Sequence, residues 1–208
     1  MAQVLKEEVQ KRIVEAALAV FAKKGYGAAT IGEIAAAAGI STGNVYRYYE
    51  NKEALFEDAV DEQLVRRLST LLGERVKALA GVDDVRRLEP DAPWFAASEE
   101  LMRFTIENRL RLVILLGRGR AEGTRWASFA ADTAEELVRL AIAHFRSVRP
   151  GIKVTDTMRF TLQRIYESLV ETNAQILAEY EEEVRIREAV AGYSRYHLAG
   201  LRALFAEV

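Results

Sequence analysis

The chain has 208 residues, half of them hydrophobic, so it is long enough to bury a substantial core. It contains no cysteine, which excludes a disulfide framework and a thiolate metal site and is compatible with a reducing cytoplasm. The formal net charge is −2, and because residues 1–52 carry +2 and the remainder −4, charge alone would not indicate a nucleic-acid partner.

The first helix is predicted over residues 6–24. Apolar side chains recur there with the 3.6-residue period of one helix face. They are Val9, Ile13, Ala16, Ala17, Val20 and Phe21. Gly25 is expected to end the helix, and the lysines at 23 and 24 suit the negative end of its dipole.

Residues 30–52 are predicted to form two short helices joined by a tight turn. Thr30 precedes an apolar run and Glu33 follows three residues later, which is the pattern of a capping box. Gly39 is expected to end the first helix in the left-handed conformation, and Ser41 can cap the second almost at once. Two helices this close together, with glycine in the turn, are typical of a helix-turn-helix.

Several short runs around this element share one dense pattern. They are Phe21–Tyr26, Thr30–Ala35, Ala38–Ser41, Gly43–Tyr49 and Asn51–Leu55. In these runs the chain resembles the DNA-binding domain of the tetracycline-repressor (TetR) family, over about the first 60 residues. One departure is Tyr49, where the family more often has phenylalanine, a change that keeps the apolar ring. The resemblance implies a helix-turn-helix DNA-binding domain of three helices at 1–52 and a helical ligand-binding and dimerisation domain at 53–208.

In a helix-turn-helix the first residues of the second helix meet base edges in the major groove. Arg47 lies three residues after Asn44 on the same face and can reach a guanine edge or a phosphate. The expected DNA contacts, with Tyr48 and Lys52 placed for phosphates, are Thr30, Ser41, Thr42, Gly43, Asn44, Tyr46, Arg47, Tyr48 and Lys52. Val45 and Tyr49 are expected to face the core. For Tyr46 a core position and a DNA contact both stay open.

Beyond residue 52 the pattern predicts further helices. A long helix over residues 51–79 would be a strut between the DNA-binding part and the rest. Residues 81–94 contain two prolines and are expected to form an irregular connection, after which a helix begins at Ser98. The apolar run Leu110–Leu116 indicates burial on more than one side. Later helices are predicted over 124–148, 155–182 and 184–205, which makes an all-α fold of about nine helices.

Residues 117–125, GRGRAEGTR, are rich in glycine and arginine and must form a loop. They lack the Gly-Lys-Ser/Thr ending of a P-loop, so a helix-to-helix turn is the simpler interpretation. In TetR-like proteins this region borders the ligand cavity, and the resemblance therefore implies that Arg118, Arg120 and Arg125 could contact an anionic ligand. The candidate ligand-binding residues are Phe104, Asn108, Arg118, Trp126 and Tyr166.

The last two predicted helices carry more apolar residues than the outer layer of a monomer requires. TetR-like dimers pair these helices into a four-helix interface, so the resemblance implies a homodimer with a self-complementary surface. The candidate interface residues are Leu162, Ile165, Leu169, Ile176, Val190, Tyr193, Tyr196, His197, Gly200, Leu201 and Leu204.

No catalytic or metal-binding arrangement stands out in the sequence. The two histidines, His144 and His197, are far apart, and no Ser-His-Asp pattern is present. We therefore expect no enzymatic activity, no metal and no cofactor. The charged start of the chain lacks the apolar core of a signal peptide, and no apolar run approaches the roughly 18 residues of a membrane span. A cytoplasmic protein without a membrane partner is expected.

Together these features predict a TetR-like transcription regulator. We expect a repressor that binds a palindromic double-stranded DNA operator and is released by an unidentified small-molecule ligand. The alternative is an architectural helix-turn-helix protein that binds DNA without any ligand. The two differ in one observable, because only the regulator has a ligand that changes operator affinity by a coupling free energy.

Overall fold

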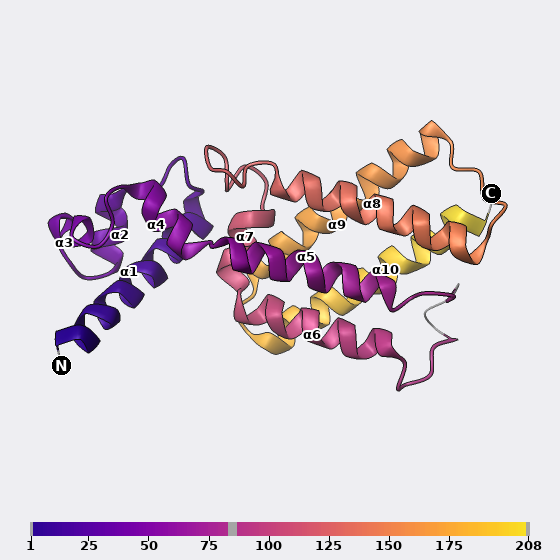
Figure 1. Cartoon of the computed structure of the whole chain (residues 1–208), viewed down its shortest axis with the longest axis horizontal. Coiled ribbons are helices and arrows are strands. Elements are labelled where there is room, and N and C mark those ends of the chain that lie inside the picture. Colours follow the sequence, from indigo (N-terminus) through magenta and orange to yellow (C-terminus); the bar gives the residue numbers. More distant parts are fainter. Residues whose placement is uncertain (1, 83–86, 207–208) are drawn as a thin grey trace.

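The computed structural model describes residues 2–82 and 87–206, and this part of the chain contains no β-strand. Its helices are α1 (Ala2–Lys24), α2 (Ile31–Ala37), α3 (Thr42–Tyr46), α4 (Lys52–Ala59), α5 (Glu62–Lys77), α6 (Pro93–Glu107), α7 (Arg109–Leu116), α8 (Phe129–Val148), α9 (Asp156–Glu179) and α10 (Glu183–Ala206). The predicted all-α class is confirmed. Figure 1 shows an elongated molecule, in which α1–α4 gather at one end and α5–α10 form a larger bundle at the other.

The cluster of α1–α4, which we call the head, has its own small core. Phe21, Tyr26 and Phe56 form the aromatic centre, and the ring centroids of Phe21 and Tyr26 lie 5.3 and 5.0 Å from that of Phe56. Both pairs meet edge-on, an arrangement that the quadrupoles of aromatic rings favour. Ile34 and Val45 belong to the same core and are fully buried, so α2 and α3 are fixed to α1 by their apolar faces.

The helix predicted over residues 51–79 is in fact two helices, α4 and α5. Asp61 has an extended backbone, and its side chain accepts a hydrogen bond from Leu64 N–H at 2.7 Å, so it begins α5 as an N-cap. A carbonyl at the end of α4 is satisfied from elsewhere, because Arg111 of α7 donates to Ala59 O at 2.8 Å. The prediction of one continuous strut was therefore wrong, whereas the ten helices of the described residues agree with the prediction of about nine.

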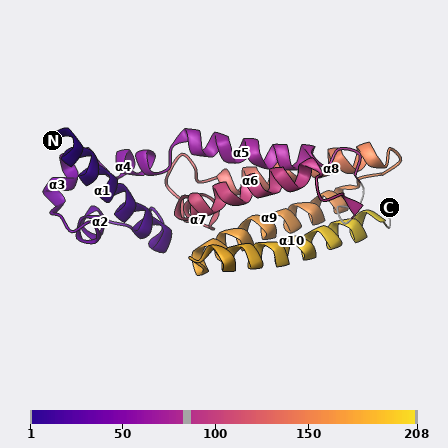
Figure 2. The ribbon, with the colours of Figure 1, turned by 90° about the horizontal axis from the view of Figure 1, so that it is seen from below.

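The bundle of α5–α10, which we call the body, is built around α7. Every residue from Leu112 to Leu116 is buried, which confirms the predicted burial on more than one side. α7 packs against α9 in the body and against α1 in the head, so it links the two parts of the molecule. Figure 2 shows α5 and α6 on one side of the body, with α9 and α10 running along the opposite side.

Two other helix boundaries differ from the prediction. α6 begins at Pro93 and not at Ser98, because proline is well suited to the first turn of a helix. α8 begins at Phe129, since residues 117–128 form a succession of turns in which Gly119 and Gly123 have φ values of 70° and 84°. The predicted loop at 117–125 is confirmed. None of the helices in the described residues combines the length and apolar character needed to cross a membrane.

Candidate nucleic-acid interface

The start of α2 is fixed by the predicted capping box. Glu33 N–H donates to Thr30 Oγ1 at 3.3 Å, and Thr30 N–H donates to Glu33 Oε2 at 3.2 Å. A hydrogen bond from Lys24, followed by those from Thr30, lowers the pKa of Glu33. The carboxylate is therefore charged at neutral pH, and its contribution to stability is lost only as the pH falls through that lowered pKa.

The turn between α2 and α3 is equally well specified. Gly39 has a φ of 66°, in the left-handed region that glycine adopts without strain. Ile40 N–H donates to Ala35 O at 3.0 Å, which is the long hydrogen bond of a Schellman motif. Ser41 then caps α3, because Asn44 N–H donates to its Oγ at 3.3 Å. The two helices are thus joined by a rigid turn, as a helix-turn-helix requires.

α3 and the residues after it bury one face and present the other to solvent. Val45 and Tyr49 are buried, which confirms their predicted inward orientation. Tyr46 is 55% exposed, so it points outward. Among the other predicted DNA contacts, Thr30, Ser41, Thr42, Gly43 and Arg47 are exposed, and Asn44 and Tyr48 are part-buried. These residues lie around α2 and α3, at the end of the molecule opposite the body (Figure 1).

Lys52 has a different environment from the one predicted. Its ammonium donates to Tyr26 O at 2.7 Å and to Ala29 O at 2.9 Å, with a longer contact of 3.4 Å to Gly27 O. It also lies 4.3 Å from the centroid of the Tyr26 ring. All three N–H donors of the ammonium are therefore engaged within the head. Lys52 links the start of α4 to the turn between α1 and α2. These internal hydrogen bonds occupy the ammonium that was predicted to contact a phosphate.

Replacing Lys52 with methionine is expected to lower the free energy of unfolding by about 1.5–3 kcal/mol, the range for hydrogen bonds to a charged group. The carbonyls of Tyr26 and Ala29 lose their donor, while the methionine keeps most of the apolar stem. Chemical denaturation measures this loss. The folded variant should also bind DNA with an unchanged salt dependence. A salt slope reduced by about one would show instead that Lys52 contacts a phosphate.

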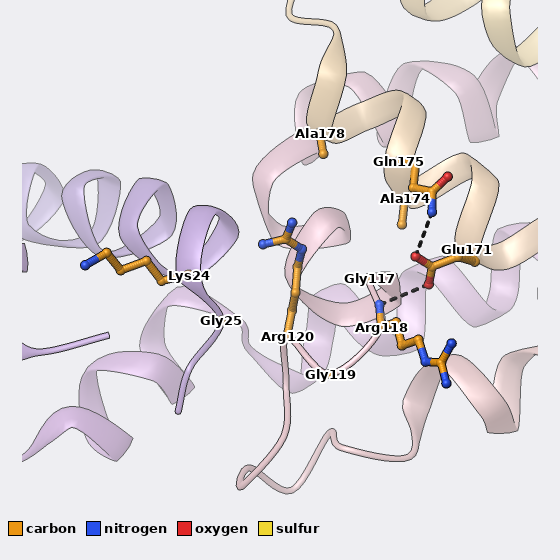
Figure 3. Close-up of a pocket in the computed structure, with 10 residues that line it drawn as sticks. All are labelled: Lys24, Gly25, Gly117, Arg118, Gly119, Arg120, Glu171, Ala174, Gln175 and Ala178. Carbon is orange, nitrogen blue, oxygen red and sulfur yellow. Dashed lines mark hydrogen bonds between the residues drawn. The ribbon is translucent and has the colours of Figure 1, made fainter. Parts of the chain in front are cut away.

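The loop between α7 and α8 attaches the head to the body. Tyr26 N–H donates to Arg120 O at 2.8 Å, and the Arg120 guanidinium donates to Ala22 O. A Cβ at Gly117 would lie 2.5 Å from Val113 O, so the loop can leave α7 in this way only with glycine there. An open pocket of about 340 Å³ lies at this junction. Figure 3 shows its lining, which includes loop residues, Lys24 and Glu171 of α9.

The three arginines of this loop do not form one anion site. Arg120 is bonded to the head, and Arg125 lies 3.6 Å from the carboxylate of Glu57 in α4 and stacks over Trp126. In Figure 3 the Arg118 side chain points away from that of Arg120. The loop therefore contributes its basic residues mainly to the contact between head and body.

The five predicted ligand-binding residues lie in different environments. Arg118 and Trp126 belong to the loop after α7. Asn108 ends α6, where its side-chain amide donates to Phe104 O at 3.0 Å. Tyr166 is buried near the middle of α9, and its ring meets that of His197 edge-on at 5.0 Å. Of this set, Tyr166 is the residue that the structure places beside a buried polar cluster.

That cluster contains residues that the sequence reasoning missed. Arg75 Nε donates to Ser98 Oγ at 3.1 Å, and the guanidinium lies 5.0 Å from the centroid of the Trp94 ring. Burial, and secondarily the charge of Arg75, lowers the pKa of His197 to about 4, so this histidine is neutral at physiological pH. Helical spacing is the sequence signal that places Arg75 on the inner face of α5, because this residue follows the buried Leu68 and Leu71 on the same side of the helix. In the part of the chain that the structure describes, no group of three side chains suits a metal ion.

The predicted dimer residues separate into two groups. Leu162, His197 and Leu201 are buried within one protomer, so the prediction was wrong for these three, because they pack onto their own body. Ile165, Leu169, Ile176, Val190, Tyr193 and Leu204 are part-buried, and Tyr196 and Gly200 are exposed. Two apolar side chains that the sequence reasoning missed, Phe160 and Val184, are 65% and 75% exposed on the same two helices, beside Tyr196 at 73%. We call the surface of α9 and α10 that carries the exposed Phe160, Val184 and Tyr196 the outer face of α9 and α10.

Comparison with known proteins finds relatives among bacterial regulators. Residues 13–59 match the bacterial regulatory proteins of the tetR family. The HTH-type transcriptional repressor Rv1474c of Mycobacterium tuberculosis is 30% identical over 162 residues, which cover 77% of this chain and 80% of that protein. The uncharacterized HTH-type transcriptional regulator YerO of Bacillus subtilis is 44% identical over 54 residues, or 26% of this chain and 19% of that protein. Among solved structures, the Thermus thermophilus transcriptional repressor FadR in complex with lauroyl-CoA is 23% identical, with a TM-score of 0.42 over 91% of this chain and 93% of that one.

Proposed function

The chain belongs to the TetR family of bacterial regulatory proteins, and from this premise we propose that it is a repressor that binds a palindromic operator as a homodimer. Family membership makes it a transcription regulator with a DNA-binding helix-turn-helix, and not an enzyme. The observation that carries the finer proposal is the outward face of α3, where Thr42, Tyr46 and Arg47 are exposed on a helix that is capped and anchored by Val45.

In the proposed complex this face enters the major groove. Asn44 and Arg47 read base edges, since an amide suits adenine and a guanidinium suits guanine. Thr30 and Tyr48 contact phosphates, which position the head without specifying sequence. Ser41, Thr42 and Gly43 are small and exposed, so they let α3 approach the bases closely. Because the partner is genomic DNA, the proposed location is the cytoplasm.

We assign DNA binding to residues 1–52, and dimerisation and ligand binding to residues 53–208. The outer face of α9 and α10 is the proposed dimer surface, because its exposed apolar side chains would be covered by the same face of a second copy. A two-fold axis there presents two heads to two half-sites. Their centres must lie about 34–36 Å apart, or a multiple of that distance, which is one turn of DNA.

Release by a small molecule would act through α7. Arg111 bonds this helix to the end of α4, and the loop that follows it bonds through Arg120 to the end of α1. A ligand that shifts α7 within the body therefore moves the head at two places and changes the spacing of the two recognition helices. Its effect on DNA affinity cannot exceed its differential affinity for the two arrangements.

Selection from a pool of random duplex DNA tests the proposed function. The bound fraction should be enriched in an inverted repeat whose half-sites are separated by a whole number of turns. A protein that acts only as an architectural DNA binder would enrich no sequence, and a monomeric reader would enrich a single half-site. Either of these results contradicts the proposal.

A further inference from the structure

The part-buried side chain of Arg75 lies between α5 and α6 and, within the described residues, has no anionic partner. It projects from the last turn of α5, where Nε donates to Ser98 Oγ at 3.1 Å and the plane covers the Trp94 ring at 5.0 Å. Within residues 2–82 and 87–206, no carboxylate forms an ion pair with it. Burial lowers the pKa of Arg75, yet an arginine remains charged at any physiological pH. Among the described residues, this cation is thus held between helices with the Ser98 hydroxyl as its hydrogen-bonding partner.

Two neighbouring polar groups are also unpaired. Trp94 Nε1 and His197 Nε2 are buried and have no hydrogen-bond partner in the described part of the chain. His197 is only 8% exposed, and its ring packs edge-on against Tyr166 at 5.0 Å. The charge of Arg75 acts electrostatically on both of these residues. Four helices, α5, α6, α9 and α10, therefore carry a cation and two unpaired polar atoms on residues that contact one another or act electrostatically on one another.

Such an arrangement is energetically unfavourable by itself. Buried polar groups are nearly always hydrogen-bonded, and a buried charge is costly unless it is paired. We propose that Arg75, Trp94 and His197 form the binding site for the carboxylate of an amphipathic ligand. The proposal rests on the proposed ligand-responsive function for the effect on DNA, and it names the chemical class of the effector.

The charge and shape of the site favour a carboxylate over a phosphate. One guanidinium neutralises one negative charge, and its planar fork matches the two oxygens of a carboxylate. A phosphate dianion would bring a second charge into the same interior, where the described residues supply no second cation. Two aromatic rings adjoin the site, Tyr166 of α9 beside His197 and Trp94 of α6 beside Arg75. The ligand would therefore carry an apolar or aromatic group behind its carboxylate.

α6 is the element that can admit the ligand. It carries both Trp94 and Ser98, yet not one of its 15 residues is fully buried. Moving α6 away from the body therefore sacrifices less buried apolar surface than moving α7, whose residues 112–116 are all buried. α7 follows α6 directly and is bonded to the head through Arg111. A displacement of α6 would therefore be transmitted through α7 to the head that carries the DNA-binding face.

Isothermal titration of the full-length protein with decanoate and phenylacetate, both below micelle-forming concentrations, tests the site. The matched probes are decanamide and phenylacetamide, which keep the shape and remove the charge, and phenyl phosphate, which supplies a dianion. At least one carboxylate should bind roughly 10- to 100-fold more tightly than its amide, as expected for hydrogen bonds to a charged group. Equal binding of carboxylates and amides, or a preference for the phosphate, would overturn the proposal.

Arg75→Met removes the charge and keeps the length of the side chain. The variant should lose the preference for carboxylate over amide, while its thermal midpoint should equal or exceed that of the parent, because an unpaired buried charge is removed. Trp94→Phe, which replaces the indole with a smaller aromatic ring that lacks the N–H, should lose part of the preference. Arg66→Met changes an exposed arginine of the same helix and should change neither property. A strongly destabilised Arg75→Met, or one that keeps the preference, would show that Arg75 has a structural role and would contradict the site.

Operator affinity is measured separately, with and without the carboxylate that binds. A carboxylate that needs Arg75 for binding but leaves DNA affinity unchanged supports the site and contradicts the proposed ligand response. Release from DNA that persists in Arg75→Met supports a ligand response and contradicts this site. The two proposals can therefore fail independently.

Discussion

Arg47→Ala and Asn44→Ala are each expected to weaken binding to the operator by about 1–3 kcal/mol per half-site, the value of a well-formed contact with a base edge. Both half-sites of a dimer lose the contact, so the total effect approaches twice that value. Binding to random DNA should change far less, because non-specific affinity comes from phosphate contacts. We expect these two residues to contact bases because they lie on or next to α3, whose opposite face is anchored in the head by the buried Val45.

Fluorescence anisotropy with labelled operator and random duplexes, at one salt concentration, measures both affinities. Arg139→Ala is the control, since Arg139 is exposed on α8 in the body and pairs with Glu136 on the same helix. It should bind both duplexes like the parent protein. Equal losses on operator and random DNA for Arg47→Ala and Asn44→Ala would remove these two residues from the list of base readers.

Tyr196→Glu is expected to convert the dimer into monomers and to reduce apparent operator affinity roughly 10²- to 10⁴-fold, because the second half-site is no longer bound by a linked head. Tyr196 is 73% exposed in a single protomer, so the substitution costs the isolated fold little. At a two-fold interface the new carboxylate would be buried twice without a partner, which is strongly unfavourable. Sedimentation at micromolar concentration measures the mass of the assembly.

Leu201→Glu is the instructive comparison on the same helix. Leu201 is buried within its own body, so this variant should unfold, with a loss of helical circular dichroism, and should not yield folded monomers. Tyr196→Glu should retain its helical content. A parent protein that sediments as a monomer, or a Tyr196→Glu variant that remains a dimer, would exclude the outer face of α9 and α10 as the dimer interface.

Local features of the head could be predicted from sequence because they depend on neighbouring residues. The capping box of Thr30 and Glu33 and the left-handed Gly39 are short-range signals, and both are present as expected. The break between α4 and α5 was a signal of the same kind that was overlooked, since Asp61 is a strong N-cap residue. The apolar side chains keep the helical spacing through both α4 and α5, so the pattern indicated one continuous helix.

Features that depend on packing between distant segments could not be predicted. A helix with two apolar faces does not reveal which face meets its own body, so Leu162, His197 and Leu201 were assigned to the wrong side. The use of Lys52 depends on carbonyls of residues 26–29, and the polar cluster joins Arg75 to residues 94, 166 and 197 from three other helices. Such long-range pairings leave no periodic trace in the sequence.

We propose that this protein reads a DNA sequence through the outward face of α3. The most direct measurement is the ratio of its affinities for the selected operator and for a scrambled duplex of the same length and composition, at physiological salt. We expect a ratio of at least about 10³, the lower end of the range for sequence-specific DNA-binding proteins. A ratio near one would contradict the account, because the protein would then bind DNA through its phosphates alone.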